Sequence, residues 1–293
     1  MIKYMRAETA DEYGIKELQE KILQIVVYID DVCQKLGLSY CLMGGSALGA
    51  VRHQGFIPWD DDLDIFMRPE DYVAFKSFFE QSGDKDNFYL QELLERDGRI
   101  ASAKLRMNNT TYIEEATQNW RIHQGVFIDI FMLHNTSNKK ICSFFQCLSA
   151  KYLLAKGQYI KGVQYKGVKR IATIIAGVTP KNFGIKSALR RLYRYDGKTT
   201  DYVCHFMGKA FFQEGVYSTN YFNSTKRVQF ETVFLNIPGK VHEYLQGRFG
   251  DYMKIPQKES IRIAQHALQW DTEKDFSEYV NKERDFSDEK YLV

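Results

Sequence analysis

The sequence lacks the features that mark several special classes of protein. Its five cysteines are scattered, odd in number and show neither a C-x-x-C pair nor a Cys/His zinc spacing, so we expect reduced thiols. No apolar stretch reaches the roughly 18 residues of a membrane-spanning helix, and the N-terminus MIKYMRAETADEYG has no apolar signal-peptide segment. Internal repeats, low-complexity tracts and Pro/Gly-rich linkers are also missing. We therefore expect a folded cytoplasmic protein.

Acidic residues are missing from one long stretch. Residues 139–194 contain 13 Lys and Arg and no Asp or Glu, although the whole chain has a net charge of only +3. The rest of the chain therefore has 27 basic and 37 acidic residues. Apolar runs such as ICSFFQCL and IATIIAGV interrupt the basic stretch, a pattern that can bind an anionic membrane surface or an anionic polymer. The alternative is a helical subdomain whose charges are simply solvated.

Hydrophobic periodicity predicts an α/β (α+β) protein. Apolar residues at steps of three and four predict a helix over 11–36. Helices are also expected after the glycine turn at 44, from Pro69, through much of 139–215 and around 241–250. Short apolar runs predict strands at 40–43, 63–67, 100–107, 110–114, 125–133 and 228–237. We expect an α/β core over 1–135, a helical basic insertion over 136–225, and a C-terminal segment over 226–293 that packs back on the core.

Three carboxylates in apolar surroundings indicate a metal site. Asp62 and Asp64 are two apart at a predicted strand, so their side chains should project from one face. Asp129 lies between Ile128 and Ile130, where an unpaired charge costs several kcal/mol of solvation. If the two strands are neighbours, the carboxylates raise one another's pKa unless a cation lies among them. Mg²⁺, with Mn²⁺ as a possible substitute, takes such oxygen ligands. A D-x-D alone is more often a turn or a helix cap. Three features together favour metal binding here: a glycine turn before the pair, the apolar strand around Asp64, and the third acid inside another apolar strand.

A glycine turn precedes the paired carboxylates. Gly44 and Gly45 let the backbone approach a ligand closely, and Ser46 adds a hydroxyl donor. The N-terminus of the following helix attracts phosphate. The turn is neither a Walker P-loop nor a Rossmann fingerprint, because the required Gly-Lys or third-glycine spacing does not follow. Its place one strand before D-x-D predicts a phosphate cradle.

Four cationic residues are candidates for offsetting the charge of a pyrophosphate. Arg52 and His53 lie between the turn and the carboxylates, whereas Lys104 and Arg106 alternate on a predicted strand. Arg is suited to this role because it donates two parallel hydrogen bonds to phosphate. Each of the four, taken singly, is more often a surface charge. We favour Lys104, because its strand SAKLR has apolar neighbours.

The segment GGSALGAVRHQGFIPWDDDLDIFMRPEDY resembles the signature of the LicD family. Three further pieces match this family in order: SAKLRMNNTTYI, QGVFIDIFML and FGDYMKIPQKES. The resemblance covers about residues 1–133 and 228–268. Bacterial members include phosphocholine transferases acting on teichoic acid and lipopolysaccharide glycans, and the family is related to fukutin-type enzymes that transfer ribitol phosphate from a CDP donor.

The resemblance implies a nucleotidyltransferase-like core with a mixed sheet and assigns roles to several residues. Asp62 and Asp64 match the metal-binding D-x-D of the family, and Asp129 matches its third acid; all three are candidate catalytic and metal-binding residues. The turn from Gly44 to Ser46 matches the G-G-[ST] motif. Phe249 stands where the family usually has Tyr, which puts a role for that hydroxyl in doubt.

The function implied is Mg²⁺-dependent transfer of phosphocholine from CDP-choline to a hydroxyl of a cell-surface glycan or lipid-linked glycan, with release of CMP. Alternatives are transfer of glycerol phosphate or ribitol phosphate in capsule synthesis, transfer of the nucleotidyl half, or a non-catalytic tether on a membrane or polymer. A nucleic-acid partner is not expected, and peripheral association with the inner face of the cell membrane through 139–194 is the alternative to a purely cytoplasmic location. An aromatic box would suit choline, and Trp59, Phe56 and Trp120 are candidates by position, although each is more often a core residue.

Overall fold

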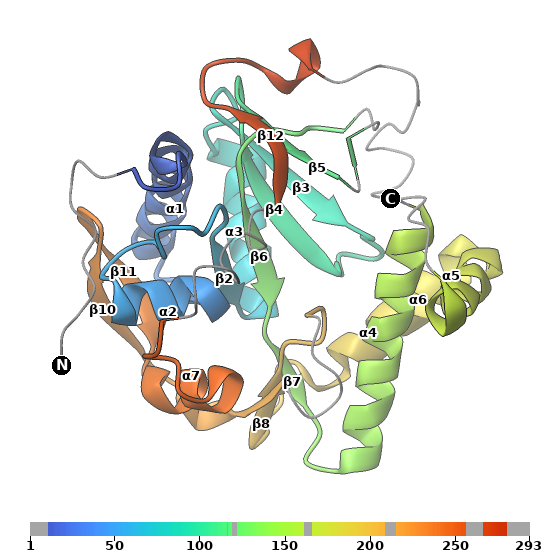
Figure 1. Cartoon of the computed structure of the whole chain (residues 1–293). Coiled ribbons are helices and arrows are strands. Elements are labelled where there is room, and N and C mark those ends of the chain that lie inside the picture. The colour runs from blue at the N-terminus through green and yellow to red at the C-terminus, as the bar shows by residue number, and fades with distance from the viewer. Residues whose placement is uncertain are drawn as a thin grey trace.

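A five-stranded mixed sheet forms the centre of the molecule (Figure 1). The computed structural model describes residues 11–115, 117–118, 122–160, 166–208, 215–255 and 266–279. The strands follow one another in the order β1 (Tyr40–Leu42), β2 (Asp64–Met67), β6 (Phe127–Met132), β4 (Ser102–Met107) and β3 (Phe88–Leu93). Strands β2 and β6 are parallel, and the other neighbouring pairs are antiparallel. The mixed α/β fold is confirmed, including the adjacency of the two strands expected to bear the acids.

Three helices from the first third of the chain pack around this sheet: α1 (Lys16–Leu36), α2 (Gly44–Arg52) and α3 (Pro69–Ser82). Helix α1 buries the apolar stripe expected from the sequence and ends at Gly37, whose φ of 67° is readily adopted only by glycine. It begins later than expected, because the Asp11 side chain accepts hydrogen bonds from the backbone amides of Ile15 and Lys16. Pro69 opens α3 as expected.

A C-terminal hairpin and helix complete this core, although they lie about 200 residues from the segments that they contact. The hairpin comprises β10 (Thr225–Phe230) and β11 (Val233–Pro238), and helix α7 (Val241–Phe249) follows. The single strand expected over 228–237 is therefore wrong, because the chain reverses at Glu231, which has a φ of 51°. Arg227 of β10 makes a bidentate ion pair with buried Asp30 of α1 at 2.7 and 2.9 Å, which fixes the hairpin against the core.

The basic stretch forms a helical unit on one side of the sheet, at the right of Figure 1. It contains α4 (Lys140–Ile160), α5 (Gly167–Val178), α6 (Lys181–Leu192) and the short η1 (Tyr193–Tyr195). These helices share a smaller apolar core with Leu94 and Ala101. The span 136–225 is not helical throughout: β7 (His134–Thr136), β8 (Tyr202–Cys204) and β9 (Val216–Ser218) form a three-stranded sheet, followed by η2 (Thr219–Tyr221). No helix in the described part of the chain is both long and apolar enough to cross a membrane.

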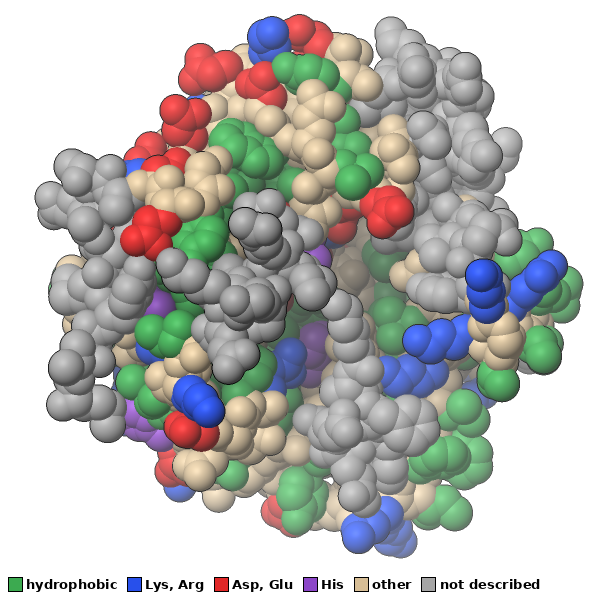
Figure 2. Space-filling model, in the orientation of Figure 1, with side chains coloured by type: hydrophobic (Ala, Val, Ile, Leu, Met, Phe, Trp, Pro, Cys, Tyr) green, Lys and Arg blue, Asp and Glu red, His purple; other side chains and the backbone are tan. Residues whose placement is uncertain are grey.

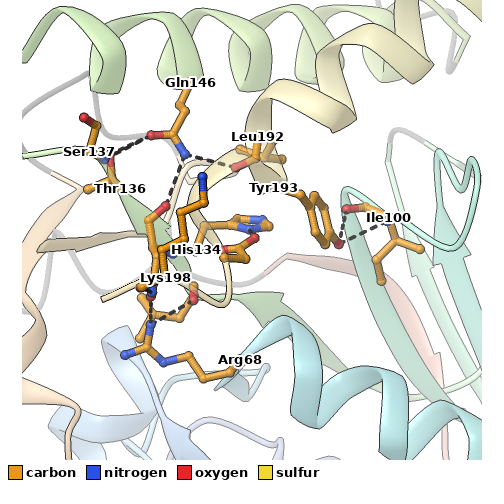
Figure 3. A network of polar contacts seen from close by, with 12 residues as sticks. Arg68, Ile100, His134, Thr136, Ser137, Gln146, Leu192, Tyr193 and Lys198 are labelled. Atoms are coloured by element: carbon orange, nitrogen blue, oxygen red, sulfur yellow. Dashed lines mark hydrogen bonds and ion pairs between the residues drawn. The ribbon is translucent and has the colours of Figure 1, made fainter. Parts of the chain in front are cut away.

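A buried polar network joins this helical unit to the central sheet (Figure 3). Gln146 of α4 donates to the carbonyl oxygens of Asn135 and Leu192 and accepts from Thr136 Oγ1. The fully buried His134 is hydrogen-bonded to Asp196 at 2.7 Å. Tyr193 Oη both accepts from the amide and donates to the carbonyl oxygen of Ile100. The network satisfies buried polar groups and connects β7 and Ile100, which lies just before β4, to the helical unit.

One more strand pair brings the C-terminal part of the chain to the front of the sheet. Strand β12 (Ala267–Asp271) pairs antiparallel with β5 (Thr111–Glu114), and η3 (Phe276–Glu278) follows. Both β5 and residue 266, directly before β12, lie beside the predicted acidic residues.

Candidate active site

A pocket of about 850 Å³ opens over one face of the central sheet. Its walls come from segments far apart in the sequence: Met43, Asp62, Asp64, Tyr112, Glu114, Phe127, Asp129, Phe131, His205, Met207, Gly208, Gly247, Arg248, Phe249 and His266. All three carboxylates expected to form the site are among them. The volume is in the range of small-molecule pockets.

The register of three strands brings the polar side chains of this face into one row. Asp64 of β2 lies opposite Asp129 of the parallel strand β6. Asp129 in turn lies opposite Lys104 of the antiparallel strand β4. Residues directly opposite each other on neighbouring strands project from the same face of a sheet. The row therefore consists of two neighbouring acids and then a base, all on strands.

Lys104 connects the acids of the row to a further acid on β5. Its Nζ lies 3.2 Å from Oδ2 of Asp129 and 3.5 Å from Oε2 of Glu114. It also lies 3.3 Å from the centroid of the Phe127 ring, a cation–π contact. This residue supplies a positive charge at the wall of the pocket, where Asp129 would otherwise be unpaired in an apolar strand.

Asp62 lies in the extended segment directly before β2, beside a tightly held Asp61. Asp61 is buried and accepts hydrogen bonds from the amides of His266 and Ala267 at 2.7 and 3.0 Å. The His266 ring contacts both acids, with Nδ1 at 3.0 Å from Asp61 Oδ1 and 3.6 Å from Asp62 Oδ2. Asp61 therefore anchors the chain before β12 at the pocket, and Asp62 faces the pocket.

The carboxylates of the wall are electrostatically coupled. Burial raises the pKa of Asp62 to about 6, with Asp61 and Asp129 raising it and the His266 cation lowering it. Burial, together with the charges of Asp62 and Asp129, raises the pKa of Asp64 well above its ordinary value. The hydrogen bond to Asp61 raises the pKa of His266 to about 9. The pocket thus holds more negative charge than its nearby cations offset.

The chemistry of this donor set fits a divalent cation. Asp62, Asp64 and Asp129 offer hard oxygen atoms from one wall, which are the ligands that Mg²⁺ takes. A cation would relieve the repulsion that raises the pKa of Asp62 and of Asp64. Within the described residues, however, no three His, Cys, Asp or Glu side chains lie close enough together to ligate one metal ion. Oδ2 of Asp129 is paired with Lys104 instead.

The glycine turn lies behind this wall and supports it. Gly44 begins α2 with a φ of 51°, and its amide donates to Tyr244 Oη at 2.9 Å. Ser46 Oγ accepts a hydrogen bond from the amide of Asp64 at 2.8 Å. A methyl group on Gly45 would lie 2.9 Å from Oδ2 of Asp60. The turn thereby fixes the first residue of β2, and its adjoining Met43 reaches the pocket.

Arg248 is the most informative residue that sequence reasoning missed. A methyl group placed on Gly44 would lie 3.7 Å from its Nη2, so the guanidinium lies at the N-terminus of α2. Its Nη1 donates to Tyr217 Oη at 3.1 Å, while its buried Nε has no hydrogen-bond partner among the described residues. The only available signal was its position directly before the FGDYM motif. The helix N-terminus and this guanidinium both favour an anion.

His205 and Phe131 were also missed, and Phe249 was noted only for lacking the hydroxyl of Tyr. His205 is buried against Phe66 and Phe131, and burial lowers the pKa of His205 to about 3. Its imidazole is therefore neutral at physiological pH. Phe131 and Phe249 contribute aromatic surface to the same pocket, so Phe249 lines it without the hydroxyl of the Tyr usual at this position.

None of the predicted substrate-binding residues is among those that line the pocket, although Lys104 contacts the lining residues Glu114 and Asp129. Arg52 donates to His53 Nε2 and to the carbonyl oxygens of Tyr252 and Lys254, and so holds the segment after α7. Arg106 is buried and donates to Gln91 and to the carbonyl oxygen of Gly125.

The predicted aromatic box is likewise not assembled from the expected residues. Trp59 packs edge-on against Tyr13 and His53. Phe56 packs against Phe230 in the core. Trp120 lies outside the described residues.

Comparison with known proteins assigns the class. Residues 37–152 match the model of the LicD/FKTN/FKRP nucleotidyltransferase domain. The resemblance to the LicD family noted in the sequence is therefore confirmed over this domain. The matched span includes the glycine turn, all three carboxylates of the pocket wall and Lys104.

Two relatives extend the comparison. The chain is 25% identical over 258 residues to the lipopolysaccharide cholinephosphotransferase LicD of Haemophilus influenzae, covering 84% of this chain and 93% of the relative. It is also 48% identical over 44 residues to the ribitol 5-phosphate transferase FKRP of Homo sapiens, covering 15% of this chain and 9% of that protein. Both are named as transferases of a phosphorylated group, and this homology supports transferase activity for the chain.

Proposed function

We propose that the protein transfers phosphocholine from a CDP-activated donor to a hydroxyl of a cell-surface glycan or lipid-linked glycan precursor, with Mg²⁺ as cofactor and CMP as product. The observation that carries this proposal is the row formed by Asp64 and Asp129 on neighbouring parallel strands, beside Asp62, in the wall of one pocket. The assignment of phosphocholine follows the relative that covers most of the chain.

The three carboxylates would hold the cation. A bound Mg²⁺ would neutralise charge on the donor diphosphate and make CMP a better leaving group. Asp62 and Asp64 are the proposed ligands whichever role Asp129 has. Asp129 either completes the oxygen set or accepts the proton of the attacking hydroxyl as general base. Metal binding by the Asp129→Asn variant separates these roles, because loss of Mn²⁺ binding would indicate a ligand, whereas retained binding with lost turnover would indicate a general base.

The cationic residues would bind the phosphates. Arg248 lies at the N-terminus of α2, where helix and guanidinium reinforce each other. Lys104 lies on the opposite side of the carboxylates, within 3.2 Å of Asp129. Lys104, which is paired with Asp129 and Glu114, could offer its ammonium to a phosphate oxygen of the donor. The charge of the pocket would then be balanced only when donor and cation are both bound.

The aromatic wall suits the transferred group. A quaternary ammonium is attracted to the faces of aromatic rings by roughly 0.5–2 kcal/mol per ring. Among the phenylalanines of the pocket, Phe131 is the ring available for this contact, because Phe127 and Phe249 already lie under the cations of Lys104 and Arg248. Transfer of ribitol phosphate is the second candidate, favoured by the similarity to the human ribitol 5-phosphate transferase.

The test is CMP release by the purified chain, with Mg²⁺ and a glycan acceptor, from CDP-choline, CDP-ribitol and CDP-glycerol in parallel. We expect release with CDP-choline, its loss on chelation of the metal, and its loss in the Asp64→Asn variant. Asp86→Asn, which changes an exposed carboxylate on another face, is the matched control. A cytidine label that appears on the acceptor instead of in free CMP would mean nucleotidyl transfer and would overturn the proposal.

A further inference from the structure

The helical unit exposes an apolar stripe on α5. Four aliphatic side chains at positions i, i+3, i+4 and i+7 form it: Ile171, Ile174, Ile175 and Val178, exposed by 60%, 46%, 60% and 73%. Thr173 and Ala176 of the same helix are buried, so the stripe faces away from the core. A surface helix of a globular protein ordinarily does the reverse and shows its polar face to water.

Helix α4 continues this surface across a groove. Its exposed apolar side chains are Ile141, Phe144, Phe145 and Leu148. Leu148 and Ile175 line a groove of about 660 Å³ between α4, α5 and α6, whose rim includes Lys151 and Arg191. We call this surface of α4 and α5 the α4–α5 face. Contiguous exposed apolar areas of this kind mark interaction sites.

The α4–α5 face belongs to a stretch whose own charges have one sign. Residues 139–194 contain no Asp or Glu. The exposed cations among the described residues of this stretch are Lys139, Lys140, Lys166, Lys169, Arg170, Lys186, Arg190, Arg191 and Arg194, of which Lys186 pairs with Asp97. Figure 2 shows blue and green side chains together over these helices, at the right of the view. The partner must therefore present negative charge beside an apolar interior.

We infer that the α4–α5 face docks on the surface of an anionic lipid bilayer. An amphipathic helix lies in the plane of such a surface, with its apolar side chains between the headgroups and its Lys and Arg beside the phosphates. The 12 residues of α5 are too few to span a bilayer. A second copy of the chain would bring two cationic faces together, which opposes association. An anionic polymer would leave the aliphatic stripe in water.

Vesicle co-sedimentation of the full chain tests this inference. We expect binding to vesicles of phosphatidylcholine with phosphatidylglycerol, no binding to phosphatidylcholine alone, and weakening with salt. The double variant Ile171→Glu/Ile175→Glu should weaken binding by about tenfold or more, because it places charge within the apolar stripe. Its matched control is Val73→Glu/Phe234→Glu, two side chains exposed by 53% and 59% on α3 and β11.

The cationic part is tested separately by Lys169→Glu/Arg170→Glu. Each basic residue near an anionic surface contributes about a fivefold gain in binding, so removing two charges weakens binding about 30-fold and reversing them weakens it further. All four substituted side chains of the two test variants are exposed, so circular dichroism and thermal unfolding should match the wild type. Lys226→Glu/Lys240→Glu, which changes net charge equally at exposed sites elsewhere, is the control.

Each outcome decides the inference. Loss of binding in both test variants, with both controls intact, supports it. It is overturned if anionic vesicles do not bind the chain, or if the controls lose binding equally. It is also overturned if only the charge variant matters and a soluble polyanion binds as tightly, or if light scattering shows a dimer that the apolar variant abolishes. None of these results depends on transferase activity.

Discussion

Replacement of Arg248 by Gln tests the proposed diphosphate site at the residue whose role was least evident from sequence. The side chain remains polar and of similar length, but the charge and the guanidinium fork are lost. Arg248 lies at the start of α2, 3.7 Å from a methyl group placed on Gly44; its Nη1 donates to Tyr217 Oη, and its guanidinium lies over the Phe249 ring. A charge-assisted hydrogen bond contributes about 1.5–3 kcal/mol. Loss of one such bond in the transition state lowers kcat/KM by about 10- to 150-fold.

The assay is the initial rate of CMP release at saturating Mg²⁺ over a range of donor concentrations, for wild type, Arg248→Gln and Arg248→Lys. Arg248→Lys keeps the positive charge but not the guanidinium fork. Its kcat/KM should therefore lie between that of the wild type and that of Arg248→Gln. Thermal unfolding and circular dichroism separate loss of activity from loss of fold. Wild-type kcat/KM in a folded Arg248→Gln variant would refute the placement of the donor phosphates beside α2.

Two further predictions concern stability. Because its hydrogen bond to Asp61 raises the pKa of His266 to about 9, above its ordinary value of 6.5, this pair should stabilise the fold fully below about pH 6.5 and lose its effect as pH rises through 9. The difference in unfolding free energy between wild type and His266→Gln, measured in urea, should narrow over that range, and a constant difference would contradict the assignment. Gly49→Ala should destabilise by about 1–3 kcal/mol, because the new methyl group would lie 2.5 Å from the carbonyl oxygen of Gly55. A methyl group on Gly247 would have no neighbouring atom within 4 Å, so Gly247→Ala should not destabilise the fold. Equal Tm values for Gly49→Ala and Gly247→Ala would refute the steric argument.

Local patterns in the sequence were sufficient for the elements that build the carboxylate wall. The apolar stripe of α1 and the short strands around Asp64 and Asp129 were expected close to their observed bounds. The reason is physical: burial of one helix face imposes an apolar period of about 3.6 residues, and burial of both faces of a strand produces a short continuous apolar run, and both patterns can be read without tertiary information. The expected metal site required the strands of Asp64 and Asp129 to be neighbours. The structure meets this requirement, because β2 and β6 are parallel neighbours with Asp64 opposite Asp129.

Features that depend on contacts across the chain were not predictable in the same way. The β10–β11 hairpin was taken as one strand because its turn contains Glu231 at positive φ rather than the Gly or Asn that signals such a turn. Arg248 approaches Gly44 across about 200 residues, and no local pattern records that approach. Arg106 alternates with Lys104 on β4 and was therefore expected at the site. It instead donates a hydrogen bond to Gln91 of β3, a strand that was not expected.

The central claim is that Asp62, Asp64 and Asp129 form one cation site, and titration with Mn²⁺ followed by electron paramagnetic resonance tests it most directly. We predict one bound Mn²⁺ per chain in the presence of CDP-choline, displaced by Mg²⁺, lost in Asp64→Asn and retained in Asp86→Asn. Binding of Mn²⁺ with unchanged stoichiometry and affinity in a folded Asp64→Asn variant would contradict the account.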